Sequence, residues 1–355
     1  MFVPVVSSTN KPLMPCHPAR ARQLVRNGKA LRRFNRGLFY IKLTQRSDGA
    51  TQPIALGIDP GSKFEGYTVK SDSHTFLNIN AEAVTWVKDA VETRHNLRRS
   101  RRNRKTPYRQ CRSNRGVGFR LPPSTRARWG WKFRIASWLG KLFPIACFVV
   151  EDIKAQTRKY KESYSALGQK DGLAKRHNKS FSPLEVGKAW FYKQLAKLGR
   201  VETLQGFETF EMRNCLGLKK LKDKSSKDFH AHCVDSWVLA NWFVGGHVKP
   251  ESERVRCITP LRFHRRQLHV QNPIEGNVRK SYGGTRSMGF TRGSLVLHIK
   301  KGLAYVGGTM AGKISLHDIG TGKRLGQSFR PEDCTFLSFN TWRTRLERAG
   351  LEPIR

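Results

Sequence analysis

The chain has 355 residues, which is enough for one to three domains with a buried core. Lys and Arg number 67 against 26 Asp and Glu, giving a formal net charge of +41. The excess positive charges repel one another unless a polyanion neutralises them, so nucleic acid is the expected partner. A membrane is not expected as a partner, because no apolar run approaches the roughly 20 residues of a membrane span.

The N-terminus has neither the basic region nor the apolar core of a secretory signal. Seven scattered cysteines without a Cys-x-x-Cys pair argue against structural zinc and suit a reducing cytoplasm. We therefore expect a cytoplasmic protein.

The first 92 residues predict a helix and then several strands. Turn residues and apolar periodicity favour a helix over residues 19–27 and a strand over 38–43. A strand over 54–58, the turn Asp59-Pro60-Gly61-Ser62 and a strand over 66–69 follow, and residues 75–84 supply a third strand of that sheet.

Residues 93–150 contain 16 Lys or Arg and no acid. The densest part begins at Arg94, and as a helix it would present Arg on every face, which requires phosphates packed around it. Its internal position argues against a disordered tail. Trp129, Trp131 and Trp138 then resume helical spacing, where core packing is favoured over stacking on bases. An apolar strand over 146–150 ends at Glu151.

The second half is read as a linker, further core elements and a small β module. Residues 155–182 are polar and lysine-rich, as in a linker. A helix over 183–199, a strand over 201–207 and a helix over 228–243 follow. Beyond Gly245-Gly246, strand patterns at 294–299, 303–306 and 313–317 alternate with glycine turns, which is typical of a small all-β module.

Three acids occupy positions that predict a metal site. Asp59 and Glu151 each end an apolar strand, and Asp235 follows His232 by three residues in the helix predicted over 228–243. Phosphodiester cleavage by two metal ions needs such converging carboxylates, and Mg²⁺ prefers hard oxygen ligands. We expect Asp59, Glu151 and Asp235 to bind two Mg²⁺ ions, for which Mn²⁺ is a plausible substitute, and His232 to act as the catalytic histidine.

Each part of this set also has an ordinary explanation. Asp-Pro-Gly after a strand is a common turn, Glu151 stands where a strand reaches solvent, and a His-x-x-Asp pair is often a surface pair. Their combination in this order favours the nuclease interpretation. Sequence alone leaves open whether Asp228 or His230 takes the place of Asp235 or His232.

The same residues resemble a known group. Gly57-Ile58-Asp59-Pro60-Gly61, Val149-Val150-Glu151 and His232-Cys233-Val234-Asp235-Ser236 resemble the three split motifs of RuvC-type nucleases, which have an RNase H-like fold. Lys11-Pro12-Leu13-Met14-Pro15 resembles the PLMP motif of the IscB and IsrB families of transposon-encoded RNA-guided nucleases. The arginine-rich stretch resembles the bridge helix of RNA-guided effectors, and Tyr282-Gly283-Gly284-Thr285 and residues 302–309 resemble their C-terminal domain.

The spacing of the motifs distinguishes the two families. IscB proteins carry an HNH nuclease between the second and third RuvC motifs, whereas here only 81 positions separate Glu151 from His232. His177-Asn178 is the one fragment similar to an HNH motif, and no paired cysteines accompany it. The chain therefore resembles IsrB, and this resemblance implies a Mg²⁺-dependent nickase that cuts the displaced DNA strand.

The expected fold is α/β: an RNase H-like (RuvC) core split in sequence, an arginine-rich bridge helix, a small N-terminal PLMP domain and a small mostly-β C-terminal module. The expected boundaries are 1–50 (PLMP domain), 51–92 (RuvC part I), 93–128 (bridge helix), 129–154 (RuvC part II), 155–200 (linker and helix in place of HNH), 201–246 (RuvC part III) and 247–355 (C-terminal module).

The resemblance implies a long structured guide RNA, a double-stranded DNA target with a flanking motif, and a monomer within a prokaryotic ribonucleoprotein, associated with the nucleoid when on target. The expected nucleic-acid-binding residues are Arg32, Arg33, Arg94, Arg98, Arg99, Arg101, Arg102, Arg104, Lys105, Arg109, Arg112, Arg265, Arg266, Arg286 and Arg292. Two alternatives remain: a guide-independent RuvC-like resolvase acting on DNA junctions, and a non-catalytic RNA-binding protein.

Overall fold

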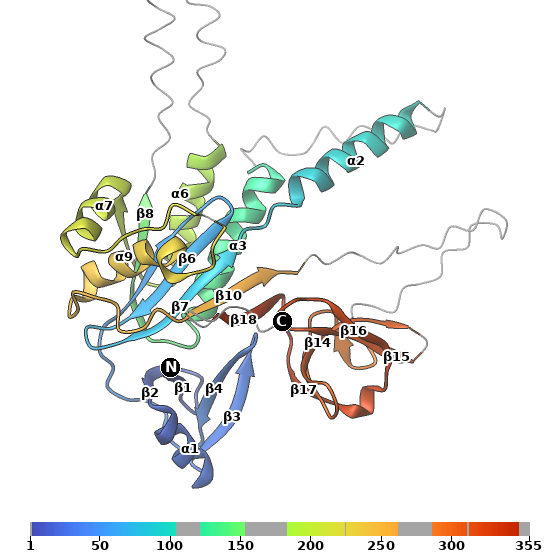
Figure 1. Ribbon diagram of the computed structural model, residues 1–355, viewed down its shortest axis with the longest axis horizontal. Coiled ribbons are helices and arrows are strands. Elements are labelled where there is room, and N and C mark those ends of the chain that lie inside the picture. The colour runs from blue at the N-terminus through green and yellow to red at the C-terminus, as the bar shows by residue number, and fades with distance from the viewer. Residues whose placement is uncertain are drawn as a thin grey trace, which may run out of the picture.

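The computed structural model describes residues 2–103, 121–152, 183–223, 225–261, 286–310 and 312–347. Within these ranges the chain forms a small N-terminal sheet, a large central sheet covered by helices, and a C-terminal β module (Figure 1). No helix in the described ranges is long and apolar enough to cross a membrane.

The N-terminal unit is a four-stranded sheet with one helix. Its elements are β1 (Val3–Val6), β2 (Pro12–Cys16), α1 (Pro18–Arg26), β3 (Ala30–Asn35) and β4 (Leu38–Leu43). The strand order is β2-β1-β4-β3, so the PLMP residues form an edge strand, which is where a sheet tolerates proline. Leu13 of that strand is buried with Ile41 and Ala21 in a separate small core.

The central sheet has seven strands. They are β5 (Ile54–Asp59), β6 (Phe64–Lys70), β7 (Thr75–Glu82), β8 (Ile145–Asp152), β9 (Arg200–Gln205), β10 (Val255–Pro260) and β18 (Trp342–Glu347). The order is β18-β10-β7-β6-β5-β8-β9. β6 is antiparallel to β5 and β7, whereas β8 is parallel to β5 and β9 is parallel to β8. The expected α/β class is confirmed, and within β7-β6-β5-β8-β9 the strand β6 alone runs antiparallel to its neighbours.

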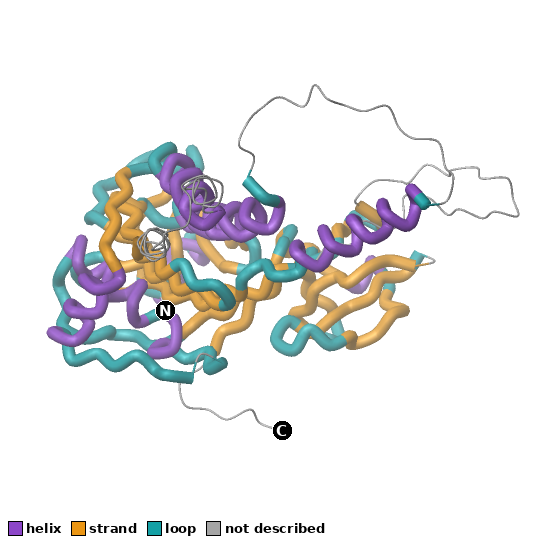
Figure 2. Tube along the Cα trace, turned by 90° about the horizontal axis from the view of Figure 1, so that it is seen from above, coloured by secondary structure: helices purple, strands orange, loops and turns teal. Residues whose placement is uncertain are grey.

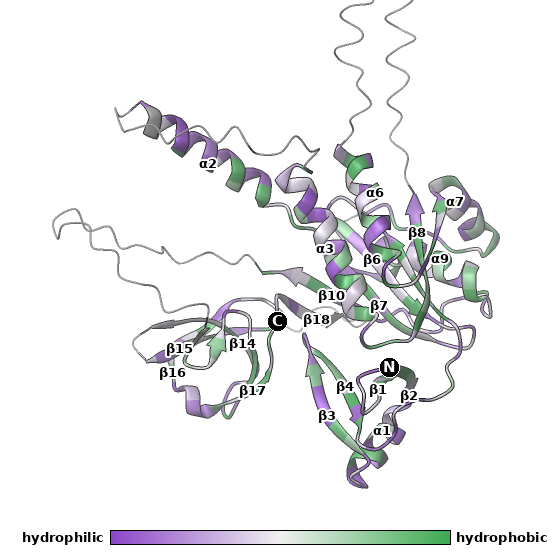
Figure 3. Cartoon of the chain, turned by 180° about the vertical axis from the view of Figure 1, so that it is seen from behind, coloured by the Kyte–Doolittle hydropathy of each residue, from purple (hydrophilic) through white to green (hydrophobic). Residues whose placement is uncertain are grey.

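Helices cover both faces of this sheet (Figure 2). The helices of this part of the chain are α2 (Val87–Arg102), which does not cover the sheet, and α3 (Pro123–Leu139), α6 (Pro183–Leu195), α7 (Gly206–Cys215), α8 (Phe229–His232) and α9 (Val234–Val244). α3 and α6 share one core with β5, β6, β7 and β8, while α9 packs with β8, β9 and β10 in other clusters. α2 extends away from the body of the protein, and Figure 3 shows hydrophilic residues along much of it.

The three tryptophans of α3 belong to the core. Trp129, Trp131 and Trp138 are 5%, 2% and 3% exposed, which leaves no face for a nucleic-acid base. Trp131 and Trp138 pack edge-to-face on Trp342 of β18, with ring centroids 5.5 Å and 5.1 Å apart. The core-packing interpretation of these residues is therefore confirmed.

The C-terminal module is all-β in the described residues apart from one short 3₁₀ turn. Its strands are β11 (Arg286–Ser287), β12 (Phe290–Thr291), β13 (Leu295–His298), β14 (Gly302–Met310), β15 (Lys313–Asp318), β16 (Arg324–Phe329) and β17 (Cys334–Ser338), and the turn is Pro331–Asp333. Three of these strands lie where the sequence places them. The expected module boundary at 247 differs from the structure, because β10 and β18 at its two ends pair with each other in the central sheet and β10 pairs with β7.

Two predicted helices differ from the observed ones. The arginine-rich helix begins at Val87 rather than at residue 93, and residues 104–120 lie outside the described ranges. The single helix predicted over 228–243 is divided, because α8 ends at His232 and Cys233 separates it from α9. His232 and Asp235 therefore belong to two consecutive helices, which corrects the prediction that they share one face of a continuous helix. The linker predicted at 155–182 lies outside the described residues.

The end of α9 is held by a buried lysine. Lys70 of β6 is fully buried and donates hydrogen bonds to the carbonyl oxygens of Ser71 and Gly245, at 2.9 Å and 2.5 Å. Gly245 follows the last turn of α9, where carbonyl groups lack helical partners. Burial lowers the pKa of the Lys70 ammonium to about 8.

This pKa predicts that stability rises with pH. Below pH 8 Lys70 is charged in both the folded and unfolded states, whereas between about 8 and 10.5 the unfolded chain binds the extra proton. We expect the free energy of unfolding to rise by about 2–3 kcal/mol over this range. We expect Lys70→Met to lose this part of the rise and the exposed-site control Lys249→Met to keep it, as measured by urea unfolding. Equal pH slopes for Lys70→Met and the wild type would contradict the assignment.

Candidate active site

Strand alternation sorts the residues of β5 and β8 between the two faces of the sheet. Successive side chains of a strand point to opposite faces. In β5, Leu56 and Ile58 pack into the core shared with α3, so Gly57 and Asp59 face α9. In β8, Val149 packs with Leu239 of α9, so Glu151 lies on that same face. Ile58 of β5 pairs with Val150 of β8, and Asp59 and Glu151 are the next residues of these two parallel strands. Their carboxyl groups therefore lie side by side.

Two glycines allow α9 to approach this face closely. A Cβ atom on Gly57 would overlap the carbonyl oxygen of Ser236, and one on Gly66 would overlap that of His232. Gly66 is paired with Asp59 across the strands. Ser236 in turn shares a hydrogen bond of 2.9 Å with Thr68 of β6. This contact brings the first turn of α9, which contains Asp235, to the edge of the sheet where Asp59 ends β5.

The structure thus brings the three predicted acids together. Asp59, Glu151 and Asp235 are 9%, 8% and 3% exposed, so water screens them weakly. Burial and the charges of Asp59 and Asp235 raise the pKa of Glu151 to about 8. Burial likewise raises the pKa of Asp59. The interaction between the two carboxyl groups raises the pKa of Glu151 further and opposes the rise at Asp59.

Two cations neutralise Asp235. Arg213 of α7 donates to Oδ1 at 2.5 Å, and the ammonium of Lys220 contacts Oδ2. The same ammonium lies 3.5 Å from Oδ2 of Asp59. Burial alone would lower the pKa of Lys220, but Asp59 and Asp235 outweigh burial and raise it. The position between the two carboxylates therefore already attracts a cation.

The donor set suits a hard divalent ion. The carboxyl oxygens are buried, face one another and bind a positive charge, as a Mg²⁺ or Mn²⁺ site requires. In the described ranges, no three His, Cys, Asp or Glu side chains are arranged as a ready-made metal cage. Both oxygens of Asp235 are engaged by Arg213 and Lys220, so ligation by Asp235 requires Lys220 to turn away.

The structure places the two alternative residues, His230 and Asp228, away from the acid cluster. His232 is 8% exposed, and its ring lies 4.7 Å from that of Phe64. His230 instead contacts the carbonyl oxygen of Lys219 at 3.1 Å and Glu253 at 3.2 Å. Asp228 is exposed and precedes the first residue of α8, where it accepts a hydrogen bond from Ser226. The carboxylate cluster is therefore formed with Asp235 and not with Asp228.

Asp152, the neighbour of Glu151, has a structural role. It faces the opposite side of the sheet, where Lys188 of α6 pairs with it at 2.6 Å. Tyr192 and Gln205 also donate hydrogen bonds to it, at 3.0 Å and 3.1 Å. These partners lower the pKa of Asp152 despite its burial.

A second buried ion pair supports the loop after Asp59, and sequence reasoning missed it. Lys132 of α3 pairs with Glu65 of β6 at 2.5 Å and also donates to the carbonyl oxygen of Gly61 at 3.3 Å. Tyr67 donates to the same carboxylate at 2.6 Å. The signal available in the sequence was Glu65 itself, because an acid in a strand is conspicuous in a chain with few acids. Nothing in the sequence singled out Arg213 or Lys220 among the many basic residues.

The predicted nucleic-acid-binding residues fall into three groups. Arg32 and Arg33 are exposed on β3, Arg94, Arg98 and Arg99 are exposed on α2, and Arg292 is exposed beside β12. Arg101 and Arg102 end α2, and Arg286 begins β11. The remaining predicted residues and the Tyr282-Gly283-Gly284-Thr285 motif lie outside the described ranges: Arg104, Lys105, Arg109, Arg112, Arg265 and Arg266.

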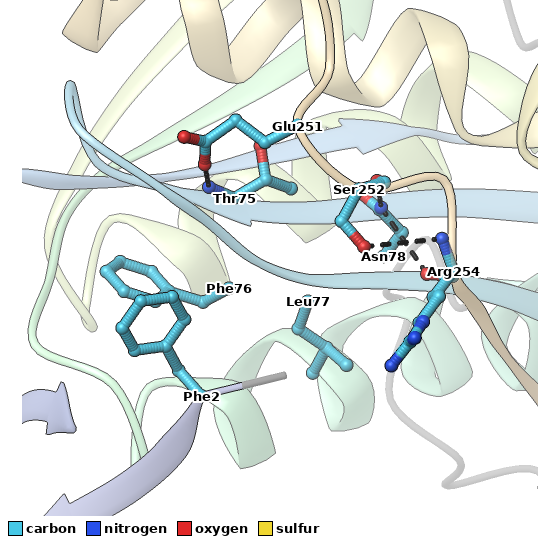
Figure 4. A pocket seen from close by; sticks show the side chains of 8 residues that line it. All are labelled: Phe2, Thr75, Phe76, Leu77, Asn78, Glu251, Ser252 and Arg254. Atoms are coloured by element: carbon cyan, nitrogen blue, oxygen red, sulfur yellow. Dashed lines mark hydrogen bonds between the residues drawn. The ribbon is translucent and has the colours of Figure 1, made fainter. Parts of the chain in front are cut away.

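A pocket of about 260 Å³ lies at the other end of the sheet (Figure 4). Phe2 and Phe76 meet edge-to-face in it, with ring centroids 5.3 Å apart. Glu251 accepts a hydrogen bond from the backbone of Thr75, at the start of β7. Its lining holds the N-terminus and residues 251–254 against β7, and it includes none of the three converging acids.

Comparison with known proteins gives a match to a family model and likenesses to solved structures, among them a RuvC complex. A family model described as RRXRR protein matches residues 3–171, a span that includes Asp59, Glu151 and the string Arg98-Arg99-Ser100-Arg101-Arg102. The solved structure "T. thermophilus RuvC in complex with Holliday junction substrate" is 13% identical with a TM-score of 0.25, and the match covers 55% of this chain and 98% of that chain. No curated protein matches the chain.

The cation between Asp59 and Asp235 gives a test that needs no activity. We expect Lys220→Met to lower the free energy of unfolding in chelator by about 1–2 kcal/mol, because it leaves buried carboxylates uncompensated. Mg²⁺ should then stabilise Lys220→Met more than the wild type, because no ammonium competes for the oxygens. Urea unfolding with and without Mg²⁺ measures both effects, with the exposed-site variant Lys222→Met as the control. An equal response to Mg²⁺ in all three proteins would contradict a metal site here.

Proposed function

We propose that this protein is a metal-dependent endonuclease of the RuvC type that is guided by RNA and nicks one strand of DNA. One observation carries the proposal: buried carboxylates from β5, β8 and α9 converge at one edge of the sheet in a chain of net charge +41. Burying like charges close together costs free energy unless a bound ligand compensates the charge. A divalent ion with a polyanionic substrate satisfies both the acids and the basic surface around them.

The roles of the residues follow from their positions. Asp59, Glu151 and Asp235 would hold two Mg²⁺ ions, which in such sites activate water and stabilise the leaving oxygen. Arg213 fixes the orientation of Asp235 from α7, and Lys132 fixes the loop after Asp59 from α3. Glu151 releases its proton before it can bind a metal ion. His232, placed against Phe64, would orient the attacking water or protonate the leaving oxygen.

The basic surfaces support an RNA guide. Exposed arginines follow α2, which extends into solvent away from the central sheet (Figure 1). A-form RNA is recognised mainly through its backbone and shape, which such a helix suits. The PLMP strand β2 and the bridge-like α2 also resemble the IsrB family. We therefore infer a long structured guide RNA, a double-stranded DNA target with a flanking motif, and a monomer in a cytoplasmic ribonucleoprotein.

The short interval between Glu151 and His232 supports a single cutting centre. It contains β9, α6 and α7, so little chain remains for an inserted nuclease domain. With one centre, the complex would cut one strand, the displaced non-target strand. This step distinguishes the proposal from IscB-like proteins, which resemble the chain but carry a second nuclease.

The decisive experiment is plasmid nicking by the protein with the RNA that copurifies with it. We expect Mg²⁺-dependent conversion of supercoiled plasmid to the nicked form when the target and its flanking motif are present. Asp59→Asn or Glu151→Gln should reduce the rate at least about 100-fold, because each removes a charged metal ligand. Asp228→Asn is the matched control, since Asp228 lies outside the carboxylate cluster.

Other outcomes point to other functions. Nicking that survives Asp59→Asn would reject the site, and linear product would reject a single centre. Cleavage of a four-way junction by RNA-free protein would favour a resolvase. Absence of metal-dependent cleavage with the copurified RNA and with every matched target would favour a non-catalytic RNA-binding protein.

A further inference from the structure

Helix α7 flanks the carboxylates along its whole length. At its start, a Cβ atom on Gly206 would lie 3.6 Å from Oε1 of Glu151. Near its end, Arg213 donates to Asp235 at 2.5 Å. α7 lies beside β8 and α9 in Figure 1 and contacts both. One end of α7 therefore lies next to Glu151 and the other next to Asp235.

The inward side of α7 is buried, whereas its outward side exposes two aromatic side chains. Thr209 and Met212, three residues apart, face inward, with Thr209 buried and Met212 packed against the cores below. Phe207 and Phe210, also three residues apart, share the outward side and are 63% and 52% exposed. Single exposed apolar residues are common, but two exposed phenylalanines on one face beside a buried acid cluster mark a binding surface.

The second phenylalanine is linked to the acids through one side chain. The guanidinium of Arg213 lies 5.3 Å from the centre of the Phe210 ring while it donates to Asp235. The guanidinium lies over one face of the ring, and the side chain of Phe210 remains 52% exposed. Phe210 is thus a positioned aromatic surface one residue away from the carboxylates.

The charges around α7 favour nucleobases over phosphates on this face. Glu208 and Glu211 lie on the helix itself and repel phosphate groups. The segment that follows supplies the exposed side chains of Lys219 and Lys222, which attract phosphates. A single strand could therefore place its backbone along the lysines and its bases on the phenylalanines.

We propose that Phe207 and Phe210 form a stacking platform for the bases of single-stranded DNA next to the phosphodiester bond that is cut. The inference rests on the proposed function and deepens it, because it assigns an unpaired strand as the form of DNA that enters the site. Stacking on aromatic rings accepts every base, as a guided nuclease requires. It needs unpaired bases, which a duplex does not offer.

The test measures binding without cutting. The full-length protein with its copurified RNA carries Asp59→Asn, and fluorescence anisotropy follows a labelled oligothymidine of about 12 nucleotides, a length typical of single-strand sites. We expect Phe207→Ala and Phe210→Ala each to weaken binding about tenfold, and the matching Phe→Tyr variants to restore it. The slope of affinity against salt should stay unchanged in the Phe→Ala variants, because no phosphate contact is lost.

Trp242→Ala is the matched control. Trp242 is a 46% exposed aromatic residue on α9, about 10 Å along the helix from Asp235, and it tests whether any exposed ring has the same effect. Equal losses for Trp242→Ala and the α7 variants would overturn the proposal. So would oligothymidine binding within about twofold of wild type in Phe207→Ala/Phe210→Ala, or undetectable binding by the parent protein.

Two further outcomes distinguish a failure of this inference from a failure of the proposed function. Reduced copurification of RNA with the double variant, at unchanged DNA affinity of the loaded complex, would assign the face to RNA and overturn the proposal. The binding measurement does not depend on cleavage. Plasmid nicking that survives Asp59→Asn would reject the nuclease site and leave the stacking result standing on its own.

Discussion

The close contact between α9 and the two glycines of the sheet is the constraint on which the site depends. Without side chains at Gly57 and Gly66, the backbone of α9 lies directly on β5, and the carbonyl oxygen of His232 at the end of α8 lies directly on β6. A larger residue at either position would push the helix outward and carry Asp235 away from Asp59 and Glu151. A separate contact holds the far end of α9, where Lys70 donates a hydrogen bond to the carbonyl oxygen of Gly245. One helix position therefore determines both the packing of the sheet and the geometry of the acids.

The negative charge of the buried carboxylates is reduced by burial and offset by neighbouring cations. Burial disfavours the ionised form of Glu151, and the charge of Asp59 raises its pKa further. Lys220 and Arg213 compensate the remaining charge at Asp235. A divalent ion would replace both the proton on Glu151 and the ammonium of Lys220, so its binding would exchange positive charges already in place and add few new ones. Lys220 thus compensates buried carboxylates at the position that a divalent ion would occupy under the proposed function.

The sequence predicted the strand-borne part of the site better than its surroundings. Asp59 and Glu151 were found because apolar runs mark β5 and β8, and an acid after such a run is conspicuous in a chain with few acids. The break at Cys233 was missed, since the apolar pattern continues through it. Pairing of β10 and β18 with β7 was missed because strands so distant in sequence carry no local signal of their neighbours. Arg213 and Lys220 were hidden among the other basic residues for the same reason, since only the fold selects them.

The adjacent acids Glu151 and Asp152 show how one strand serves both chemistry and stability. Because alternate residues face opposite sides, Glu151 lies with Asp59 under α9, while Asp152 binds Lys188 and Tyr192 of α6. The pKa of Glu151 is raised and that of Asp152 is lowered, although the two residues are neighbours in the chain. The difference arises from their partners: one acid meets other acids, and the other meets a cation and hydrogen-bond donors. A shift of register by one residue in β8 would exchange these environments, so the pairing of β8 with β5 selects which carboxylate lies beside Asp59 and Asp235.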